Sequence, residues 1–287
     1  MGETTRALIG VFKLRIGVVI MLSSLAGLAV TPGTGPGAWQ TLLFALAVLL
    51  SSASAGAFNQ FAERDLDARM GRTSRRPFVT GRYQANGYWL AVIGLLLLVS
   101  VAAAILATNT IAALYVFLGA FTYGIVYTVW LKRRTWLNIV IGGLSGSFAV
   151  LAGAAAVDPT LSPIPVLLAV VLFLWTPPHF WSLAFVYARE YAAAEVPMLP
   201  VVAGNKTAAR VIFAHTLTLV LVSLLPFYYG LGWIYLTGAM AGGAYFLFTS
   251  YKLLRHPDIP HALANFRASL LQLTLLITAC VADAWLG

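Results

Sequence analysis

Three oxygen-bearing side chains recur at a four-residue spacing at the end of an uncharged apolar block. These are Asn59, Glu63 and Asp67. An α-helix would place all three within about 80° of one face. A hard divalent cation prefers carboxylate, amide and water oxygens as ligands. The spacing therefore predicts a metal site in which these three side chains are the ligands.

An arginine cluster follows this pattern directly. Arg72, Arg75 and Arg76 carry planar, forked donors that suit phosphate oxygens. Metal ligands beside such donors indicate a phosphorylated substrate that binds with Mg²⁺. Asp65 would point away from the ligand face of an ideal helix, so we expect it to serve a second metal or to orient an arginine. A solvated loop with incidental salt bridges is the alternative, and it is weakened because the ligand spacing continues the period of a membrane helix.

A second unusual segment surrounds Pro177-Pro178. Two prolines inside an apolar helix interrupt its hydrogen-bond ladder, and free backbone at membrane depth is tolerated only around a cavity. His179 follows the pair among aromatic rings that include Trp175. It could ligate a haem iron, act as an acid or base, or donate to a freed carbonyl. A smaller charged cluster, Arg189-Glu190-Tyr191, comes after it.

Apolar blocks of membrane-spanning length must position these residues. Hydrophobic residues make up 60% of the 287 residues and charged residues 9%, against roughly 25% charged in an average soluble domain. Four blocks carry at most one charge, at 16–62, 83–131, 135–188 and 211–251. Because a span requires about 20 apolar residues, each block holds two helices, and a last span follows near the C-terminus. We expect an all-α polytopic membrane protein with about nine transmembrane helices and a single domain, residues 1–287.

The eighteen lysines and arginines predict how the chain is oriented. All lie at the N-terminus or in the loops after the second, fourth, sixth and eighth spans, whereas the opposite loops carry only Asp158. The positive-inside rule then places the N-terminus and the basic loops in the cytoplasm and the C-terminus outside. Taken alone, the cluster Lys132-Arg133-Arg134 is typical of a stop-transfer anchor. The net charge of +9 is therefore a topology signal and does not indicate nucleic-acid binding.

At these segments the chain resembles the UbiA-type membrane prenyltransferases, and in particular their haem-farnesylating branch, the haem O synthases or protohaem IX farnesyltransferases. Asn59-x3-Glu63-x3-Asp67 looks like the superfamily's first metal motif, Asn-x3-Asp-x3-Asp. Four strings resemble the haem branch in particular, at 63–77, 127–143, 176–181 and 196–201. Together these strings are far more specific than any one motif.

The resemblance implies transfer of a farnesyl group from farnesyl diphosphate to a vinyl carbon of haem B, giving haem O and diphosphate. It implies Mg²⁺ as cofactor, a site on the cytoplasmic side of a bacterial inner membrane, and haem A synthase or terminal oxidase assembly as neighbouring partners. The residues to which it assigns metal or diphosphate are Asn59, Glu63, Asp67, Arg72, Arg76 and Lys132, with Asp65 and Glu190 secondary. The expected substrate contacts are Tyr127, Trp175, His179 and Tyr191, in an apolar groove that also includes Phe58 and Tyr123.

The chain departs from the family pattern in two charged motifs. It reads Lys13-Leu14-Arg15 where the family has Lys-Pro-Arg, and Arg189-Glu190-Tyr191 where the family has Asp-Asp-Tyr. One carboxylate of the second acidic motif is thus an arginine, which argues against a second metal site. We expect Arg189 to contact the diphosphate and to replace part of a metal's charge.

Three other functions remain open from the residues alone. An aromatic prenyltransferase that makes a quinone precursor would differ only in its acceptor, and the haem-branch strings argue against it. A transporter would also combine interrupted helices with buried polar residues, but here the charged clusters gather at one membrane face. A non-catalytic assembly factor would not require metal-binding and arginine motifs side by side.

Overall fold

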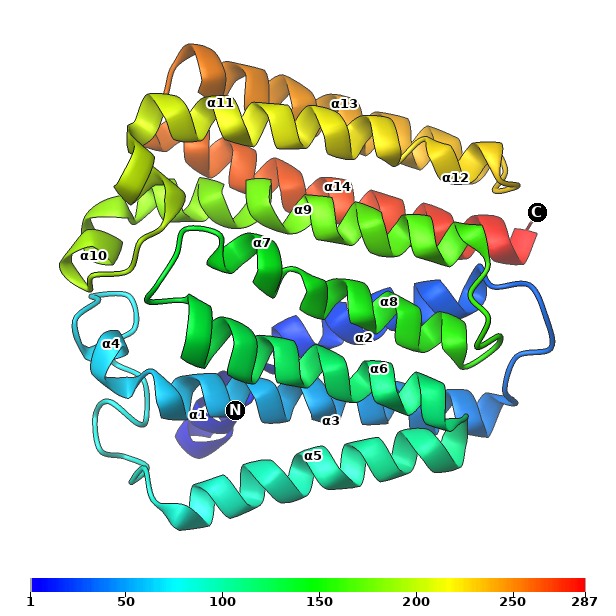
Figure 1. Ribbon diagram of the computed structural model, residues 1–287, viewed down its shortest axis with the longest axis horizontal. Helices are drawn as coiled ribbons and strands as arrows, with labels where there is room; N and C mark the ends of the chain where they lie inside the picture. The colour runs from blue at the N-terminus through cyan, green and yellow to red at the C-terminus, as the bar shows by residue number, and fades with distance from the viewer. Residues whose placement is uncertain (1, 287) are drawn as a thin grey trace.

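Long helices account for nearly all of the architecture. The computed structural model describes residues 2–286 (Figure 1). The elements are α1 (Glu3–Val11), α2 (Leu14–Ala29), α3 (Ala38–Ala62), α4 (Arg64–Ala68), α5 (Gly87–Ala107), α6 (Thr110–Phe121), the π-helix η1 (Thr122–Leu131), α7 (Asn138–Gly142), α8 (Leu144–Ala155), α9 (Pro163–Val186), α10 (Ala188–Ala193), α11 (Leu199–Val222), α12 (Leu225–Tyr228), α13 (Trp233–Arg255) and α14 (Ile259–Leu286). The all-α prediction is confirmed.

The number of membrane spans is close to the predicted nine but is not fixed by apolarity alone. Within residues 2–286, seven helical segments are long and apolar enough to cross a membrane, and α1 with α2, bent by 49°, makes an eighth. α13 has 23 residues and packs along α11 and α14, yet it is less apolar. It corresponds to the eighth span that the sequence predicted and would bring the total to nine, so nine is an approximate count.

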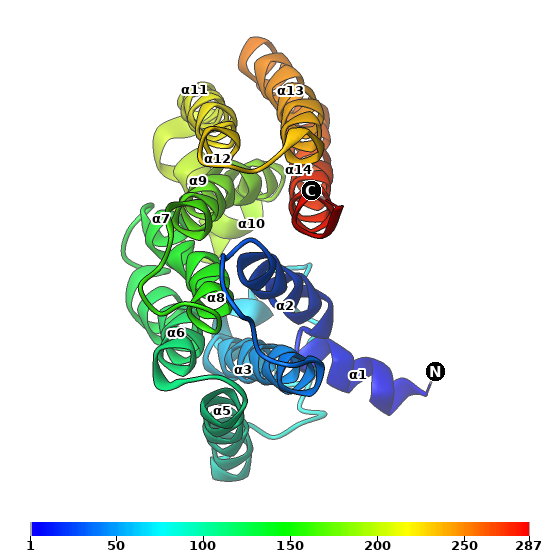
Figure 2. The same ribbon diagram turned by 90° about the vertical axis from the view of Figure 1, so that its right-hand side faces the viewer.

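The basic loops gather at one end of the bundle, which we call the basic end. α4, α10 and the loops that follow η1 and α13 lie there, on the left of Figure 1, whereas the C-terminus lies at the opposite end. Figure 2 shows α5 at one edge of the bundle and α13 at the other. The grouping of the loops agrees with the grouping of lysines and arginines along the sequence.

Close approach of α2 to α8 depends on two glycines. A Cβ atom on Gly27 would lie 2.2 Å from the carbonyl oxygen of Val150, and one on Gly153 would lie 1.7 Å from that of Ser24. Helices in a membrane associate by such backbone contact, because lipid removes the hydrophobic drive between them. This contact holds α2, and the residues at its N-terminal end, against the centre of the bundle.

Departures from α-helix at the basic end include three that involve residues lining the site. Lys13 adopts a left-handed conformation (φ 48°) between α1 and α2, and Glu63 (φ −100°, ψ 11°) separates α3 from α4. The third is η1. Its hydrogen bonds from residue i to residue i−5 extend to Lys132, whose amide donates to Tyr127 O at 2.9 Å. Such π-helical segments are rare and occur frequently at functional sites.

The proline pair does not end its helix. The sequence predicted an interruption at Pro177-Pro178, whereas α9 remains helical from Pro163 to Val186. The hydroxyls of Thr176 and Ser182 donate to the carbonyls four residues earlier, at 3.0 and 2.6 Å. The prolines remove two amide donors, but helical backbone continues on both sides of them.

Candidate active site

A cavity of about 1240 Å³ lies within the bundle and reaches the basic end. Its volume exceeds the roughly 300–1,000 Å³ of a typical small-molecule pocket, so it has room for more than one ligand. Ten of the thirteen predicted site residues line it: Asn59, Glu63, Asp67, Arg72, Arg76, Tyr127, Lys132, Trp175, His179 and Tyr191. The structure thus brings together residues that the sequence places in four separate segments.

The predicted ligand residues keep a common register across the end of α3. The amide of Glu63 donates to Asn59 O at 3.0 Å, and that of Asp67 donates to Glu63 O at 2.8 Å. All three side chains are about 2% exposed and line the cavity. The i, i+4 bonding therefore continues although the helix is interrupted at Glu63, and the three oxygens share one wall.

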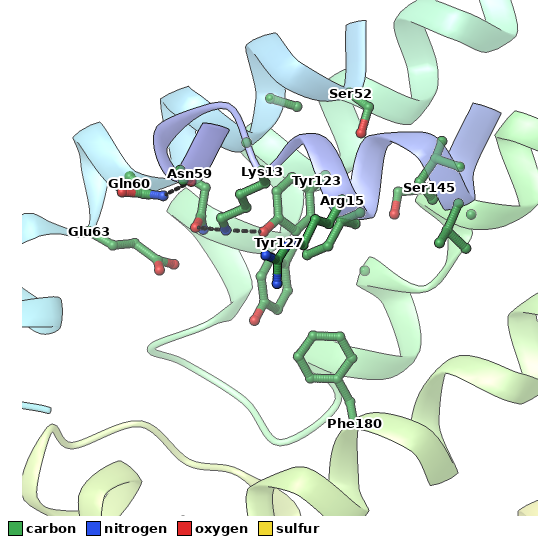
Figure 3. A pocket seen from close by; sticks show the side chains of 18 of the residues that line it. Lys13, Arg15, Ser52, Asn59, Gln60, Glu63, Tyr123, Tyr127, Ser145 and Phe180 are labelled. Atoms are coloured by element: carbon green, nitrogen blue, oxygen red, sulfur yellow. Dashed lines mark hydrogen bonds between the residues drawn. The ribbon is translucent and has the colours of Figure 1, made fainter. Parts of the chain in front are cut away.

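Each of these three side chains contacts a cationic side chain. Lys13 Nζ donates to Asn59 Oδ1 at 2.6 Å and to the Tyr123 hydroxyl at 2.8 Å (Figure 3). Arg76 pairs with Asp67 at 2.6 Å, and Lys132 pairs with Glu63. We call these six residues, Lys13, Asn59, Glu63, Asp67, Arg76 and Lys132, the polar half of the cavity. Its buried carboxylates are compensated by paired charge, as burial requires.

The π-helix explains why its side chains meet the polar half. Bonding from residue i to i−5 widens the turn, so residues four and five apart share a face. Tyr123, Tyr127 and Lys132 therefore all line the cavity, and the rings of the two tyrosines stack at 5.5 Å. Thr128 adds an anchor, since its hydroxyl accepts a bond from Asn59 Nδ2 at 2.9 Å.

The chemistry of the polar half fits a divalent cation. Glu63 Oε1 is fully enclosed and has no hydrogen-bond partner among the described residues. A buried carboxylate oxygen without a partner is costly, and a bound cation would satisfy it. No cluster of three or more His, Cys, Asp or Glu side chains suited to a metal occurs within residues 2–286. The predicted ligands are two carboxylates and one amide oxygen. So small a set suits Mg²⁺, because that ion usually retains several waters as its other ligands.

Three predicted residues lie outside the cavity lining. Asp65 is exposed and pairs with Arg133 at 2.8 Å, and the hydrogen bond from that guanidinium lowers the pKa of the Asp65 carboxyl. Glu190 accepts the backbone amide of Arg72 at 3.2 Å, and Arg189 is exposed on α10. Asp65 therefore pairs with an arginine away from the cavity, and its expected roles stay predictions.

An aromatic stack also lines the cavity. The His179 ring stacks between Trp175, at 4.2 Å between centroids, and Phe266, at 4.7 Å. His179 Nδ1 lies 2.7 Å from Ser269 Oγ, and Trp175 Nε1 donates to Ser269 O at 2.9 Å. We call Trp175, His179, Phe266 and Ser269 the aromatic half of the site. Its members come from α9 and α14.

Sequence reasoning missed several of these residues. Lys13 was noted only as part of a departure from the family pattern, yet its side chain lies at the centre of the polar half. Phe266 and Ser269 lie in a segment with no local signal of a site. Phe58 was expected in the groove, but it packs outside the cavity lining, beside Val11 and Phe78.

Comparison with known proteins shows close relatives over the whole chain. The family model described as "UbiA prenyltransferase family" matches residues 20–276. The chain is 55% identical to "Protoheme IX farnesyltransferase 2" of Paramagnetospirillum magneticum over 100% of both sequences. It is 49% identical to "Protoheme IX farnesyltransferase 1" of the same organism, over 98% of this chain and 99% of that one. A relative in Cenarchaeum symbiosum, "Protoheme IX farnesyltransferase 1", is 38% identical over 97% and 96%.

Solved structures share the fold at low sequence identity. A digeranylgeranylglyceryl phosphate synthase superposes with a TM-score of 0.80 at 16% identity, over 99% of both chains. A UbiA homologue from Archaeoglobus fulgidus, solved with DMAPP and Mg²⁺, gives 0.75 at 15% identity, over 94% of this chain and 98% of that one. At these identities the likeness shows the helical architecture alone.

Proposed function

Because the chain belongs to the UbiA prenyltransferase family, we propose that it transfers a farnesyl group from farnesyl diphosphate to a vinyl group of haem B, forming haem O and diphosphate. The names of its relatives, 55% and 49% identical over essentially the whole chain, support this substrate pair. The observation that carries the proposal is the cavity itself. It is lined both by buried carboxylates and cations and by aromatic side chains that include a buried histidine.

The polar half binds the diphosphate end of the donor. Arg15, Arg72 and Arg75 line the cavity beside the Asn59–Glu63–Asp67 wall and supply donors for phosphate oxygens. The guanidinium of Arg72 is held by the Tyr191 hydroxyl at 3.3 Å. Bound Mg²⁺, held by Asn59, Glu63 and Asp67, would supply positive charge to the leaving group as the allylic C–O bond breaks.

Charge develops in two places during this step, and the chain has groups for both. The electron pair of the C–O bond leaves with diphosphate, where Lys13, Lys132 and Arg76 offset the new negative charge. The allyl fragment becomes positive, and the stacked faces of Tyr123 and Tyr127 present negative π density to it. The vinyl π pair of the porphyrin then forms the new C–C bond, and water completes the product by adding a hydroxyl group and losing a proton.

The apolar tail requires a route from the bilayer into the cavity. Ile16 and Val19 of α2 and Leu270 of α14 line the cavity and are also exposed on the helix surfaces. An opening between these helices would admit a prenyl chain laterally from lipid. The charged headgroup would then reach the basic end, which we assign to the cytoplasmic side of the membrane by the positive-inside rule. Enzymes of haem A synthesis or oxidase assembly would receive the product there.

One assay tests the proposal. The purified chain in lipid nanodiscs is incubated with Mg²⁺, farnesyl diphosphate and haem B, and the porphyrin fraction is analysed by mass spectrometry. We expect haem O, dependent on Mg²⁺ and on farnesyl diphosphate. Absence of haem O together with prenylation of a phenolic acid offered in parallel would contradict the proposal and favour an aromatic acceptor.

A further inference from the structure

We infer that Ser269 fixes the His179 ring in the tautomer whose Nε2 lone pair faces the cavity, and that this nitrogen is the axial ligand of the iron in the porphyrin substrate. The inference rests on the proposed function, because it requires a metalloporphyrin in the aromatic half. It adds a role for Ser269, a residue that no motif pointed to, and a reason why the acceptor must carry a metal.

The tautomer follows from two hydrogen bonds at Ser269. Its hydroxyl donates to the carbonyl of Phe266 at 2.6 Å, and its single proton is used there. The same oxygen lies 2.7 Å from His179 Nδ1 and can only accept at that contact. Nδ1 therefore carries the ring proton, and Nε2 carries a lone pair.

The ring is also held in its plane. Trp175 and Phe266 stack on its two faces, at interplanar angles of 17° and 27°. Trp175 is itself tethered, because its indole N–H donates to the carbonyl of Ser269 at 2.9 Å. Ser269 thus positions the histidine with its side chain and the stacking partner with its backbone. Such outer contacts orient a ligating histidine and raise its basicity.

Nε2 faces the cavity without a partner from the described residues. His179 lines the cavity, and its Nε2 is not among the fully enclosed polar atoms that lack a hydrogen bond. A lone pair repels the propionate carboxylates of a porphyrin, which are acceptors like itself. Among the groups that a haem carries, the iron is the one that accepts a nitrogen lone pair, and imidazole suits iron well.

A free metal ion would not be held here, which points to a porphyrin-bound one. The residues described include no cluster of three or more His, Cys, Asp or Glu that could bind a metal. A single histidine is a poor site for a bare ion. A haem iron already has four porphyrin nitrogens and needs only one axial ligand from the protein, which one fixed imidazole supplies.

Resonance Raman and absorption spectroscopy of the full chain in nanodiscs, titrated with ferrous haem B, test the inference. We expect an iron–histidine stretching band in the wild type. The band should be lost in His179→Ala and restored when imidazole is added to that variant. The wild type and His179→Ala should bind metal-free protoporphyrin IX with affinities within about twofold of each other, since this porphyrin has no iron to ligate.

Ser269 variants separate positioning from mere packing. Ser269→Ala should weaken haem affinity about 10–100-fold and shift the iron–histidine band, because Nδ1–H loses its acceptor. Ser269→Thr, which keeps the hydroxyl, should restore both. Ser147→Ala is the matched control: Ser147 also donates to a helix carbonyl, that of Ala169 at 2.8 Å, but it makes no hydrogen bond to the aromatic half among the described residues. It should leave the band unchanged.

The outcomes distinguish this inference from the proposed function. If haem O forms but no histidine band exists, or if the band survives in His179→Ala, iron ligation is wrong while farnesyl transfer stands. If Ser269→Ala leaves the band position and the affinity unchanged, the role of Ser269 is wrong. If the wild type neither binds haem nor forms haem O, the proposed function fails, and the inference fails with it.

Discussion

The two halves of the cavity are built in different ways. The polar half takes its carboxylates from one stretch of chain across the α3–α4 junction, and each oxygen group there contacts a cation. The aromatic half joins α9 to α14 through bonds between residues 90 or more positions apart, and the partner of His179 there is the uncharged Ser269. Local spacing therefore aligns the oxygen groups of the first, whereas helix packing creates the second. Under the proposed function, bond cleavage takes place in the polar half and the acceptor binds in the aromatic half.

The strongest test of this division is removal of a carboxylate from the polar half. Asp67→Ala should lower kcat by at least about 10²–10³-fold, because leaving-group charge loses its stabilisation. Asp65→Ala is the control, since that neighbouring carboxylate is exposed and lies outside the cavity; it should change kcat little. Single-turnover assays with radiolabelled farnesyl diphosphate measure both. Full turnover in Asp67→Ala would show that the metal assignment is wrong.

Lys13 tests whether the cations of the polar half act on the donor. Lys13→Met should reduce kcat/KM for farnesyl diphosphate about 10–100-fold, corresponding to a charged hydrogen bond of about 1.5–3 kcal/mol. Haem binding, measured by optical titration, should stay the same because the aromatic half is untouched. Lys206→Met is the matched control on an exposed part of α11. If Lys13→Met weakened haem binding as much as it lowered kcat/KM for farnesyl diphosphate, the two halves would not act separately.

The α2–α8 contact should affect both halves together. Gly153→Ala places a methyl group against the Ser24 carbonyl and should destabilise the protein by about 1–3 kcal/mol through overpacking. A lower melting temperature in a tryptophan-fluorescence thermal shift measures this. Gly94→Ala on α5 is the control, because nothing lies within 4 Å of its added methyl group. An unchanged melting temperature in Gly153→Ala would show that the contact is not tight.

Arg189 should give the smallest effect. The sequence led us to expect a diphosphate contact, whereas the side chain is exposed and outside the cavity lining. From this placement, Arg189→Ala should change the KM for farnesyl diphosphate less than about twofold, as most surface substitutions cost no more than about 0.5 kcal/mol. Steady-state kinetics decide the matter. A tenfold rise in KM would indicate that Arg189 contacts the diphosphate directly and that the polar half extends to α10.

The sequence predicted side-chain placement correctly where it depends on spacing over successive helical turns. The i, i+4, i+8 pattern of Asn59, Glu63 and Asp67 placed three oxygens on one wall, and the structure keeps that register through the break at Glu63. It was less informative for the backbone at the basic end. The π-helical turns of η1 could not be predicted from its apolar sequence, because α-helical and π-helical segments contain the same kinds of residues.

The sequence by itself determined that this is an all-helical membrane protein with its charge at one end and three oxygen-bearing side chains in helical register at the end of its second span. These properties depend on composition and on periods of a few residues, which the chain carries locally. Only the tertiary structure decided which cation meets which carboxylate, that Lys13 reaches Asn59, and that Ser269 holds His179. Those contacts depend on how distant helices pack, and backbone contacts such as that between Gly153 and Ser24 set that packing.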